Sequence, residues 1–208
     1  MMNNFIFENK TKVYFGKGGV KEYLGGLLAN FGETVMLAYG GGSIKCNGVY
    51  DEIMGILNAQ GKCVVEFSGI MSNPTYAKVQ EGAKLARENH VDLILAVGGG
   101  SVIDSAKAAA VGFEADCDVW DFFAGKAAVA EALPVYTILT LPAAGSEQSI
   151  RAVLSNEEGM KTGIGVEAIR PKASAVNPEL FFTLPRWQIG AGVTDMISHI
   201  MERYFTNT

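Results

Sequence analysis

The chain has 208 residues, of which 49% are apolar and 19% are charged, and its formal net charge is -5. This length and composition predict one large folded domain, or a domain and part of a second, and exclude general disorder. The acidic balance disfavours a nucleic-acid partner, and no apolar run approaches the roughly 20 residues that a membrane-spanning helix needs.

Apolar runs alternate with amphipathic stretches through the first 140 residues. The runs predict strands at residues 5–7, 12–15, 34–39, 62–67, 93–97 and 135–140. The amphipathic stretches predict helices at residues 20–30, 49–60 and 76–89, and a fourth that follows the turn GGGS and ends near residue 111. Asn73 is the expected N-cap of the third helix. Because the strands are apolar on both faces, we predict helices on both sides of them: an α/β fold with a doubly wound, mostly parallel sheet of the Rossmann type.

The pattern changes after Thr140. A glycine loop, LPAAGSEQS, leads to a predicted hairpin of residues 150–154 and 161–166, and a segment at 170–176 precedes a turn. The last element is a predicted helix at 184–205 whose apolar residues cover most of its circumference, and a helix of that kind is expected to be buried. We therefore interpret residues 1–183 as a dinucleotide-binding α/β domain and residues 184–208 as the first helix of a truncated helical domain.

The cellular location is predicted from features that the sequence lacks. The first residues, MMNNFIFENK, have neither the basic segment nor the apolar run of a signal peptide. Cys46, Cys63 and Cys117 are widely spaced and form no CxxC pair. This spacing disfavours a disulfide framework and a cysteine zinc site, and it fits a reducing environment. We expect a cytoplasmic protein.

A glycine turn of Gly98, Gly99, Gly100 and Ser101 follows an apolar strand and opens a helix. Doubly wound sheets bind ligands at this edge, beyond the carboxyl ends of their strands. Glycines let backbone N–H groups approach phosphate oxygens, and the helix N-terminus adds partial positive charge. This predicts a pyrophosphate site, with Asp104 placed to accept a hydrogen bond from a ribose hydroxyl or a nicotinamide amide. The alternative is a tight turn that uses glycine for its geometry alone.

A second glycine turn, from Gly40 to Ser43, follows the strand at 34–39 and contains no carboxylate. A carboxylate here would bind the adenosine ribose and exclude a 2′-phosphate, whereas Ser43 and Lys45 would accept one. We therefore predict NADP in preference to NAD. The alternative is an ordinary loop with a solvated lysine. Neither turn has the usual dinucleotide fingerprint, because Ile103 occupies the third glycine position of the first turn.

Five motifs occur together in the order FGKG, NP, GGGSVIDSAK, TLPAAGSE and DMISH, beginning at Phe15, Asn73, Gly98, Thr140 and Asp195. Each motif is weak alone, but the combination extends over essentially the whole chain and resembles the iron-containing alcohol dehydrogenases. The similarity is greatest to the branch of NADPH-dependent butanol dehydrogenases and aldehyde reductases. The resemblance implies an N-terminal α/β domain of the dehydroquinate synthase-like type, a C-terminal helical domain, and an active site between them.

The resemblance also implies roles for individual residues. Gly99, Gly100 and Ser101 would hold the pyrophosphate, and Asp104 would lie near the nicotinamide end of the cofactor. The remaining implied contacts are the adenosine 2′-phosphate with Gly41, Gly42 and Ser43, the adenine with Thr140 and Leu141, the nicotinamide with Ser146, and the cofactor ribose or phosphates with Lys161. Many relatives read TTAGTGSE where this chain reads TLPAAGSE, so the resemblance implies fewer hydroxyls for the cofactor here.

Asp195 and His199 are four residues apart and share one face of the predicted last helix. The spacing alone fits an Asp–His hydrogen bond as well as half of a metal site. The resemblance implies two of four ligands for Fe²⁺ or Zn²⁺, a Lewis acid on the substrate oxygen during hydride transfer. The other implied ligands include two histidines, and the sequence has one further histidine, His90. We predict that this chain cannot complete the metal site.

Three functions are consistent with the sequence. The first is the incomplete or inactive N-terminal part of an NADP-dependent, metal-containing alcohol dehydrogenase that interconverts small alcohols and aldehydes. The second is a non-catalytic nucleotide-binding module. The third is an enzyme like glycerol dehydrogenase or dehydroquinate synthase, which share this architecture. The resemblance also allows a homodimer, and we expect no nucleic-acid or membrane partner.

Overall fold

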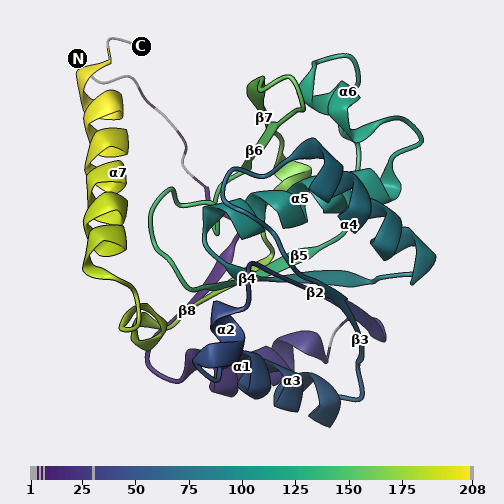
Figure 1. The fold of residues 1–208 in the computed structure, drawn as a ribbon, viewed down its shortest axis with the longest axis vertical. Coiled ribbons are helices and arrows are strands. Elements are labelled where there is room, and N and C mark those ends of the chain that lie inside the picture. Colours follow the sequence, from purple (N-terminus) through teal and green to yellow (C-terminus); the bar gives the residue numbers. More distant parts are fainter. Residues whose placement is uncertain (1–3, 5, 7, 30, 207–208) are drawn as a thin grey trace.

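The computed structural model describes residues 4, 6, 8–29 and 31–206. One or two helices separate each of the first five strands from the next (Figure 1). The strands are β1 (Lys12–Phe15), β2 (Thr34–Tyr39), β3 (Cys63–Phe67), β4 (Leu93–Gly98), β5 (Val135–Leu139), β6 (Arg151–Ser155), β7 (Lys161–Gly165) and β8 (Ala173–Val176). The helices are α1 (Gly19–Leu28), α2 (Ser43–Cys46), α3 (Val49–Ala59), α4 (Tyr76–Glu88), α5 (Gly100–Glu114), α6 (Val119–Phe123), α7 (Arg186–Phe205) and the 3-10 turns η1 (Glu167–Ile169) and η2 (Pro178–Phe181).

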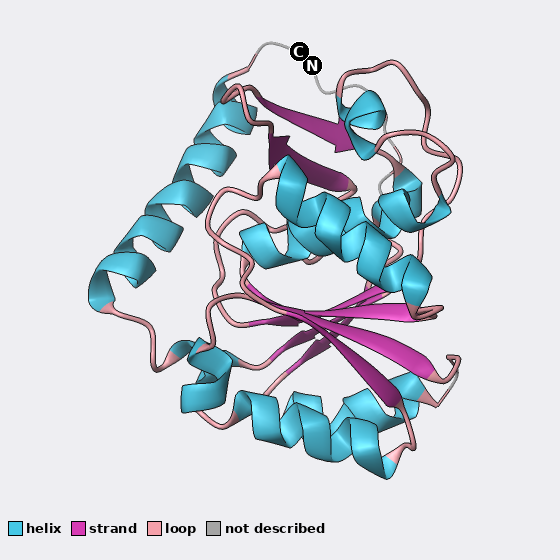
Figure 2. Cartoon of the chain, turned by 45° about the vertical axis from the view of Figure 1, so that its right-hand side comes forward, coloured by secondary structure: helices cyan, strands magenta, loops and turns pink. Residues whose placement is uncertain are grey.

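The core is a six-stranded parallel sheet in the order β1-β8-β5-β4-β2-β3. Helices α1 and α3 cover one face, and α4 and α5 cover the other (Figure 2). Successive side chains of a strand point to opposite faces, so Val35 packs on the α1 and α3 side while Met36 packs on the α4 and α5 side. The predicted doubly wound α/β fold is confirmed.

The predicted hairpin is also confirmed, since β6 and β7 pair in antiparallel register. Two short helices, α2 and α6, were not predicted because four or five residues carry no helical period. Asn73 is not the N-cap of α4: its φ of +57° belongs to a turn. Thr75 caps the helix instead, and its hydroxyl accepts from the backbone N–H of Lys78 at 3.4 Å.

The predicted strand at residues 5–7 falls largely outside the described part. Phe5 and Phe7 are not described, and Ile6 belongs to no strand. The sheet therefore begins, within the described residues, with β1, and this strand is paired along its length with β8. No helix among the described residues combines the length and apolar character needed to cross a membrane.

Helix α7 stands beside the α/β body rather than within it (Figure 1). Its only buried residue is Gly192. The large apolar side chains that it exposes are Trp187, Ile189, Val193, Ile197, Ile200, Met201, Tyr204 and Phe205. The expectation that this helix is buried is therefore wrong for the structure as described, although its apolar circumference is as predicted.

Candidate functional site

A cavity of about 530 Å³ lies at the carboxyl edge of the sheet. Strands β2 and β4 are neighbours there, so the turns that follow them face the same space. The predicted cofactor residues that line the cavity are Gly41, Gly42, Ser43, Gly98, Gly99, Gly100, Ser101, Thr140 and Leu141. Two glycine turns that are more than 50 residues apart in the sequence thus form one site.

The first turn connects β4 to α5 and supplies the positive end of a 15-residue helix. Its N-cap residue, Gly99, has no side chain that could satisfy the first N–H groups of α5. These groups have no partner inside the helix, and together with the helix dipole they favour an anion. A Cβ added at Gly100 would meet only the Ala144 side chain, at 4.0 Å. The turn can therefore receive a phosphate against its backbone.

The second turn connects β2 to α2 and is shaped by Gly42. This residue has a φ of +101°, a conformation that residues with a Cβ rarely adopt. A Cβ built on Gly41 or Gly42 meets no atom within 4 Å, so the turn borders open space. Ser43, the first residue of α2, lines the same cavity. The turn thus offers a hydroxyl and bare backbone, without a carboxylate.

Lys45 lies two residues beyond this turn but does not line the cavity. Its ammonium is 3.2 Å from the Glu66 carboxylate on β3 and lies over the Tyr50 ring, 4.4 Å from the centroid. The hydroxyls of Tyr39 and Tyr50 also donate to Glu66 and hold the pKa of that carboxyl below its ordinary value. The structure therefore gives Lys45 an acidic partner and does not support the predicted phosphate contact.

Asp104 and Ser146 were predicted to contact the cofactor but do not line the cavity. The Ser146 hydroxyl donates to the Asp104 carboxylate at 2.5 Å, and the backbone N–H of Val153 donates to the same carboxylate at 3.1 Å. Burial raises the pKa of Asp104. The third member of this group is Lys107, which is completely buried and was not predicted. A lysine three residues after an aspartate on an otherwise apolar helix was the available signal.

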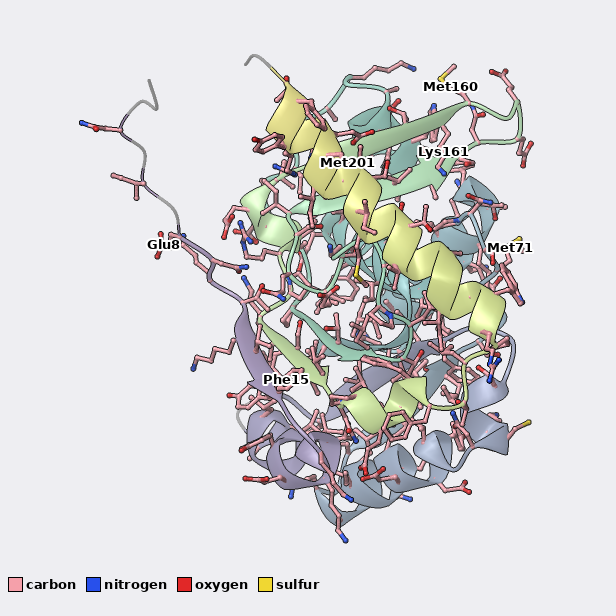
Figure 3. The ribbon with its side chains drawn as sticks, turned by 90° about the vertical axis from the view of Figure 1, so that its left-hand side faces the viewer. Glu8, Phe15, Met71, Met160, Lys161 and Met201 are labelled. Atoms are coloured by element: carbon pink, nitrogen blue, oxygen red, sulfur yellow. The ribbon has the colours of Figure 1, made fainter. Side chains whose placement is uncertain are left out.

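Lys161 lies on strand β7, outside the cavity lining. Its ammonium donates to the Asn73 side-chain oxygen at 3.2 Å. Met71 and Ser72, from the same segment as Asn73, line the cavity. In Figure 3, Met71 and Lys161 lie on the same side of α7. Met71, Ser72, Thr183 and Gln188 were not predicted, because only the tertiary fold brings them to the glycine turns.

Asp195 and His199 lie on one face of α7, as predicted. The Asp195 carboxylate is 3.6 Å from the imidazole Nε2, and the Glu202 carboxylate is 3.7 Å from Nδ1. All three side chains are substantially exposed to solvent. The described residues contain no group of three or more His, Cys, Asp or Glu side chains suited to a metal ion. Asp195, His199 and Glu202 therefore do not form such a group among the described residues.

Comparison with known proteins agrees with this architecture. The sequence model of the iron-containing alcohol dehydrogenase family matches residues 10–178. The chain is 46% identical over 207 residues to a probable NADH-dependent butanol dehydrogenase 2 of Bacillus subtilis, covering 99% of this chain and 53% of that protein. It is 38% identical over 212 residues to the NADPH-dependent aldehyde reductase YqhD of Escherichia coli, covering 99% of this chain and 53% of that protein.

A solved structure shows the same similarity in three dimensions. The NADH-dependent butanol dehydrogenase A of Thermotoga maritima superposes with a TM-score of 0.94 at 44% sequence identity, covering 98% of this chain and 52% of that protein. The chain thus spans about half the length of the relatives that it matches. The family match and the shared fold lead to one conclusion: this chain belongs to the iron-containing alcohol dehydrogenase family.

Proposed function

We propose that this chain is the nucleotide-binding part of an NADP-dependent, metal-containing alcohol dehydrogenase that interconverts alcohols and aldehydes. The observation that carries the proposal is the single cavity lined by both glycine turns and by the start of α5. A generic strand-to-helix turn would not need a second glycine turn facing it. No observation favours a glycerol dehydrogenase or dehydroquinate synthase activity.

The chain's own residues would bind and orient the dinucleotide. Backbone N–H groups of Gly99, Gly100 and Ser101 would hold the pyrophosphate at the N-terminus of α5. The turn that contains Ser43 would receive the adenosine ribose, and Thr140 with its neighbour would border the adenine. A bound nicotinamide supplies the hydride donor or acceptor.

The preference for NADP over NAD stays a prediction. With Lys45 held by Glu66, its support is the Ser43 hydroxyl and the absence of a carboxylate from the turn. Relatives are named for both cofactors, since the Bacillus subtilis protein is called NADH-dependent and the Escherichia coli protein NADPH-dependent. We expect the Ser43 hydroxyl to favour NADP over NAD at this site.

We further propose that α7 begins a second, helical domain and that Asp195 and His199 contribute two ligands to an Fe²⁺ or Zn²⁺ site completed there. The exposed apolar face of α7 supports this proposal. For the 208-residue chain alone we therefore expect dinucleotide binding without turnover, which is the behaviour of a binding module. The small alcohol or aldehyde substrate, a homodimer and a cytoplasmic location stay predictions.

Titration of the chain with NADPH and NADH, followed by nicotinamide fluorescence, tests the binding proposal. We expect saturable binding of both cofactors, with NADPH bound more tightly. Ser43→Asp places a carboxylate at the second turn and is expected to weaken NADPH by about tenfold or more while sparing NADH. Asn58→Asp adds the same charge to an exposed position of α3 and should change neither affinity. Failure of the unaltered chain to bind either cofactor would overturn the proposal.

A turnover assay separates binding from catalysis. The chain is mixed with NADPH, butyraldehyde and either Fe²⁺ or Zn²⁺, and oxidation of NADPH is followed by absorbance. We expect no metal-dependent rate, because the described residues present fewer than three grouped metal ligands. A metal-dependent rate would show that the chain completes its own metal site and would contradict the proposal for the chain alone.

A further inference from the structure

Lys107 is a charged side chain that the fold has placed entirely out of solvent. It lies on α5, two turns after the glycine turn. Its ammonium donates to three backbone carbonyls, those of Ser146 at 2.6 Å, Ser149 at 2.9 Å and Arg151 at 2.9 Å. An ammonium has three N–H donors, which is enough for a bond to each carbonyl. All three carbonyls belong to the segment that runs from the end of β5 into β6.

Asp104 holds the same segment from one helical turn earlier. Its carboxylate accepts from the Ser146 hydroxyl and from the backbone N–H of Val153 on β6. The Ser146 hydroxyl also lies 3.0 Å from the Lys107 ammonium, so it links the two charged groups. Burial lowers the pKa of Lys107 to about 8 and raises that of Asp104, and the opposite charge of each counters the effect on the other. The two opposite charges therefore lie close together without a direct hydrogen bond and are bridged by the Ser146 hydroxyl.

The held segment, residues 140–150, has no strand pairing of its own. Its internal backbone bonds are those from the N–H of Gln148 to Gly145 at 3.2 Å and from the N–H of Ser149 to Ser146 at 3.3 Å. Backbone carbonyls buried without a partner are costly. The loop is also bonded to other elements: the Thr140 N–H donates to the Gly98 carbonyl at 3.1 Å, and Arg170 and Ser174 donate to the carbonyls of Gln148 and Glu147. The contacts with α5 are those that hold the carbonyls of Ser146 and Ser149.

The other side of this loop touches two functional elements. Leu141 lines the cofactor cavity, and its Cβ lies 3.2 Å from where a Cβ on Gly99 would stand. The Pro142 carbonyl lies 2.6 Å from where a Cβ on Gly192 would stand, so α7 crosses the loop in close contact. A displacement of the loop would therefore move one wall of the cavity and the seat of the helix that carries Asp195.

We propose that Lys107 is a positioning residue, which acts with Asp104 to fix the loop of residues 140–150 as a wall of the cofactor cavity and a seat for α7. Its effect on cofactor binding rests on the proposed function, whereas its effect on the loop does not. Asp104 and Ser146 then act on the dinucleotide through the loop rather than by direct contact.

Hydrogen exchange of the chain without any cofactor tests the loop contact. Lys107→Met keeps the length of the side chain and removes its donors. We expect faster exchange at the amides of Gln148, Ser149 and Val153, and unchanged exchange in the turn between β2 and α2. Ser146→Ala, which removes the hydroxyl link and keeps the three carbonyl bonds, should give a smaller increase at the same amides. Ser146→Ala also decides the question if Lys107→Met does not fold.

NADPH affinity tests the positioning role. Lys107→Met is expected to weaken NADPH by about tenfold, because a loop that is no longer fixed must be ordered when the dinucleotide binds. Leu57→Ala removes a fully buried side chain on α3, far from the loop, and serves as the control for lost stability. The affinities are measured under conditions in which both variants are folded. There, Leu57→Ala should bind NADPH as tightly as the unaltered chain does.

The two measurements separate the possible failures. An unaltered chain that binds neither dinucleotide would overturn the proposed function, and the exchange data would still decide the role of Lys107 in the loop. Wild-type exchange in both Lys107→Met and Ser146→Ala would overturn the loop contact. Faster exchange with unchanged NADPH affinity would reduce Lys107 to a purely structural residue and overturn the positioning role.

Discussion

Helices α3 and α7 are both amphipathic stretches of the same chain, yet they meet opposite environments. Helix α3 buries Val49, Ile53 and Leu57 against the sheet. Helix α7 is nearly twice as long, buries only Gly192, and leaves Ile200 67% exposed. An apolar helical pattern therefore predicts that a helix has a partner surface, and it does not predict where that surface is.

This difference divides the structure into two parts. One is the α/β body, the sheet with the helices that pack on it, and the other is α7, whose apolar face is exposed. The body covers both faces of its sheet with helices (Figure 2). In Figure 3, α7 crosses the outside of the molecule, with Met201 on its surface. An exposed apolar face of this extent marks an interaction surface in most soluble proteins. This is the physical basis for proposing that a helical domain covers α7.

The largest expected effect comes from matched truncations in the two regions. Leu95→Ala, at a fully buried position of β4, should lower the free energy of unfolding by about 2–5 kcal/mol. Ile200→Ala, on the exposed face of α7, should change it by less than about 0.5 kcal/mol. Urea unfolding followed by circular dichroism compares the two variants. Equal losses would mean that α7 is packed in solution, and the contrast between the regions would disappear.

The buried Lys107 makes the stability of the α/β body depend on pH. Burial lowers the pKa of Lys107 to about 8 from 10.5, while Asp104 and Glu147 oppose that shift and Arg170 adds to it. Below pH 8 both states hold the proton and the full cost of burying the charge is present. Between pH 8 and 10.5 the native state releases its proton and the unfolded state keeps it, so this group's contribution to stability rises with pH, by up to about 3 kcal/mol.

Lys107→Met removes this contribution and isolates it from other titrating groups. The free energy of unfolding is measured by urea titration from pH 7 to pH 10 for both proteins. The difference, unaltered chain minus variant, should increase with pH over that interval. A constant difference would show that Lys107 keeps an ordinary pKa in the folded state.

The smallest expected effect concerns the contact between the body and α7. Gly192→Ala places a Cβ 2.6 Å from the Pro142 carbonyl and should destabilise the seating of the helix by about 1–3 kcal/mol. Gly190→Ala, on the same helix, meets nothing within 4 Å and should stabilise it by about 0.5–1 kcal/mol. Helix content during thermal unfolding, with exchange at residues 186–205, measures both. A neutral Gly192→Ala would show that α7 does not rest on the loop.

Local features of the sequence predicted the body well. Continuous apolar runs such as β4 have few alternatives to a buried parallel strand, and glycines at the strand ends located the cavity. The ion pair of Lys45 was not predictable, because Lys45 lies on α2, Glu66 lies on β3 21 residues away, and only the tertiary fold brings them together. The N-cap was misplaced because Asn73 and Thr75 are both good capping residues, and the backbone turn at Asn73 decided between them.

The pairing of β1 with β8 constrains how the body assembles. Lys12 is opposite Ala173 and Phe15 is opposite Val176. During folding, β1 can therefore take its place in the sheet only when β8 is available. Closing so long a segment has an entropic cost that only the finished sheet repays. During synthesis, we therefore expect β2, β3 and β4 to form a nascent sheet early. Strand β1 would then pair with β8 last. This step would make the folding of the whole sheet cooperative.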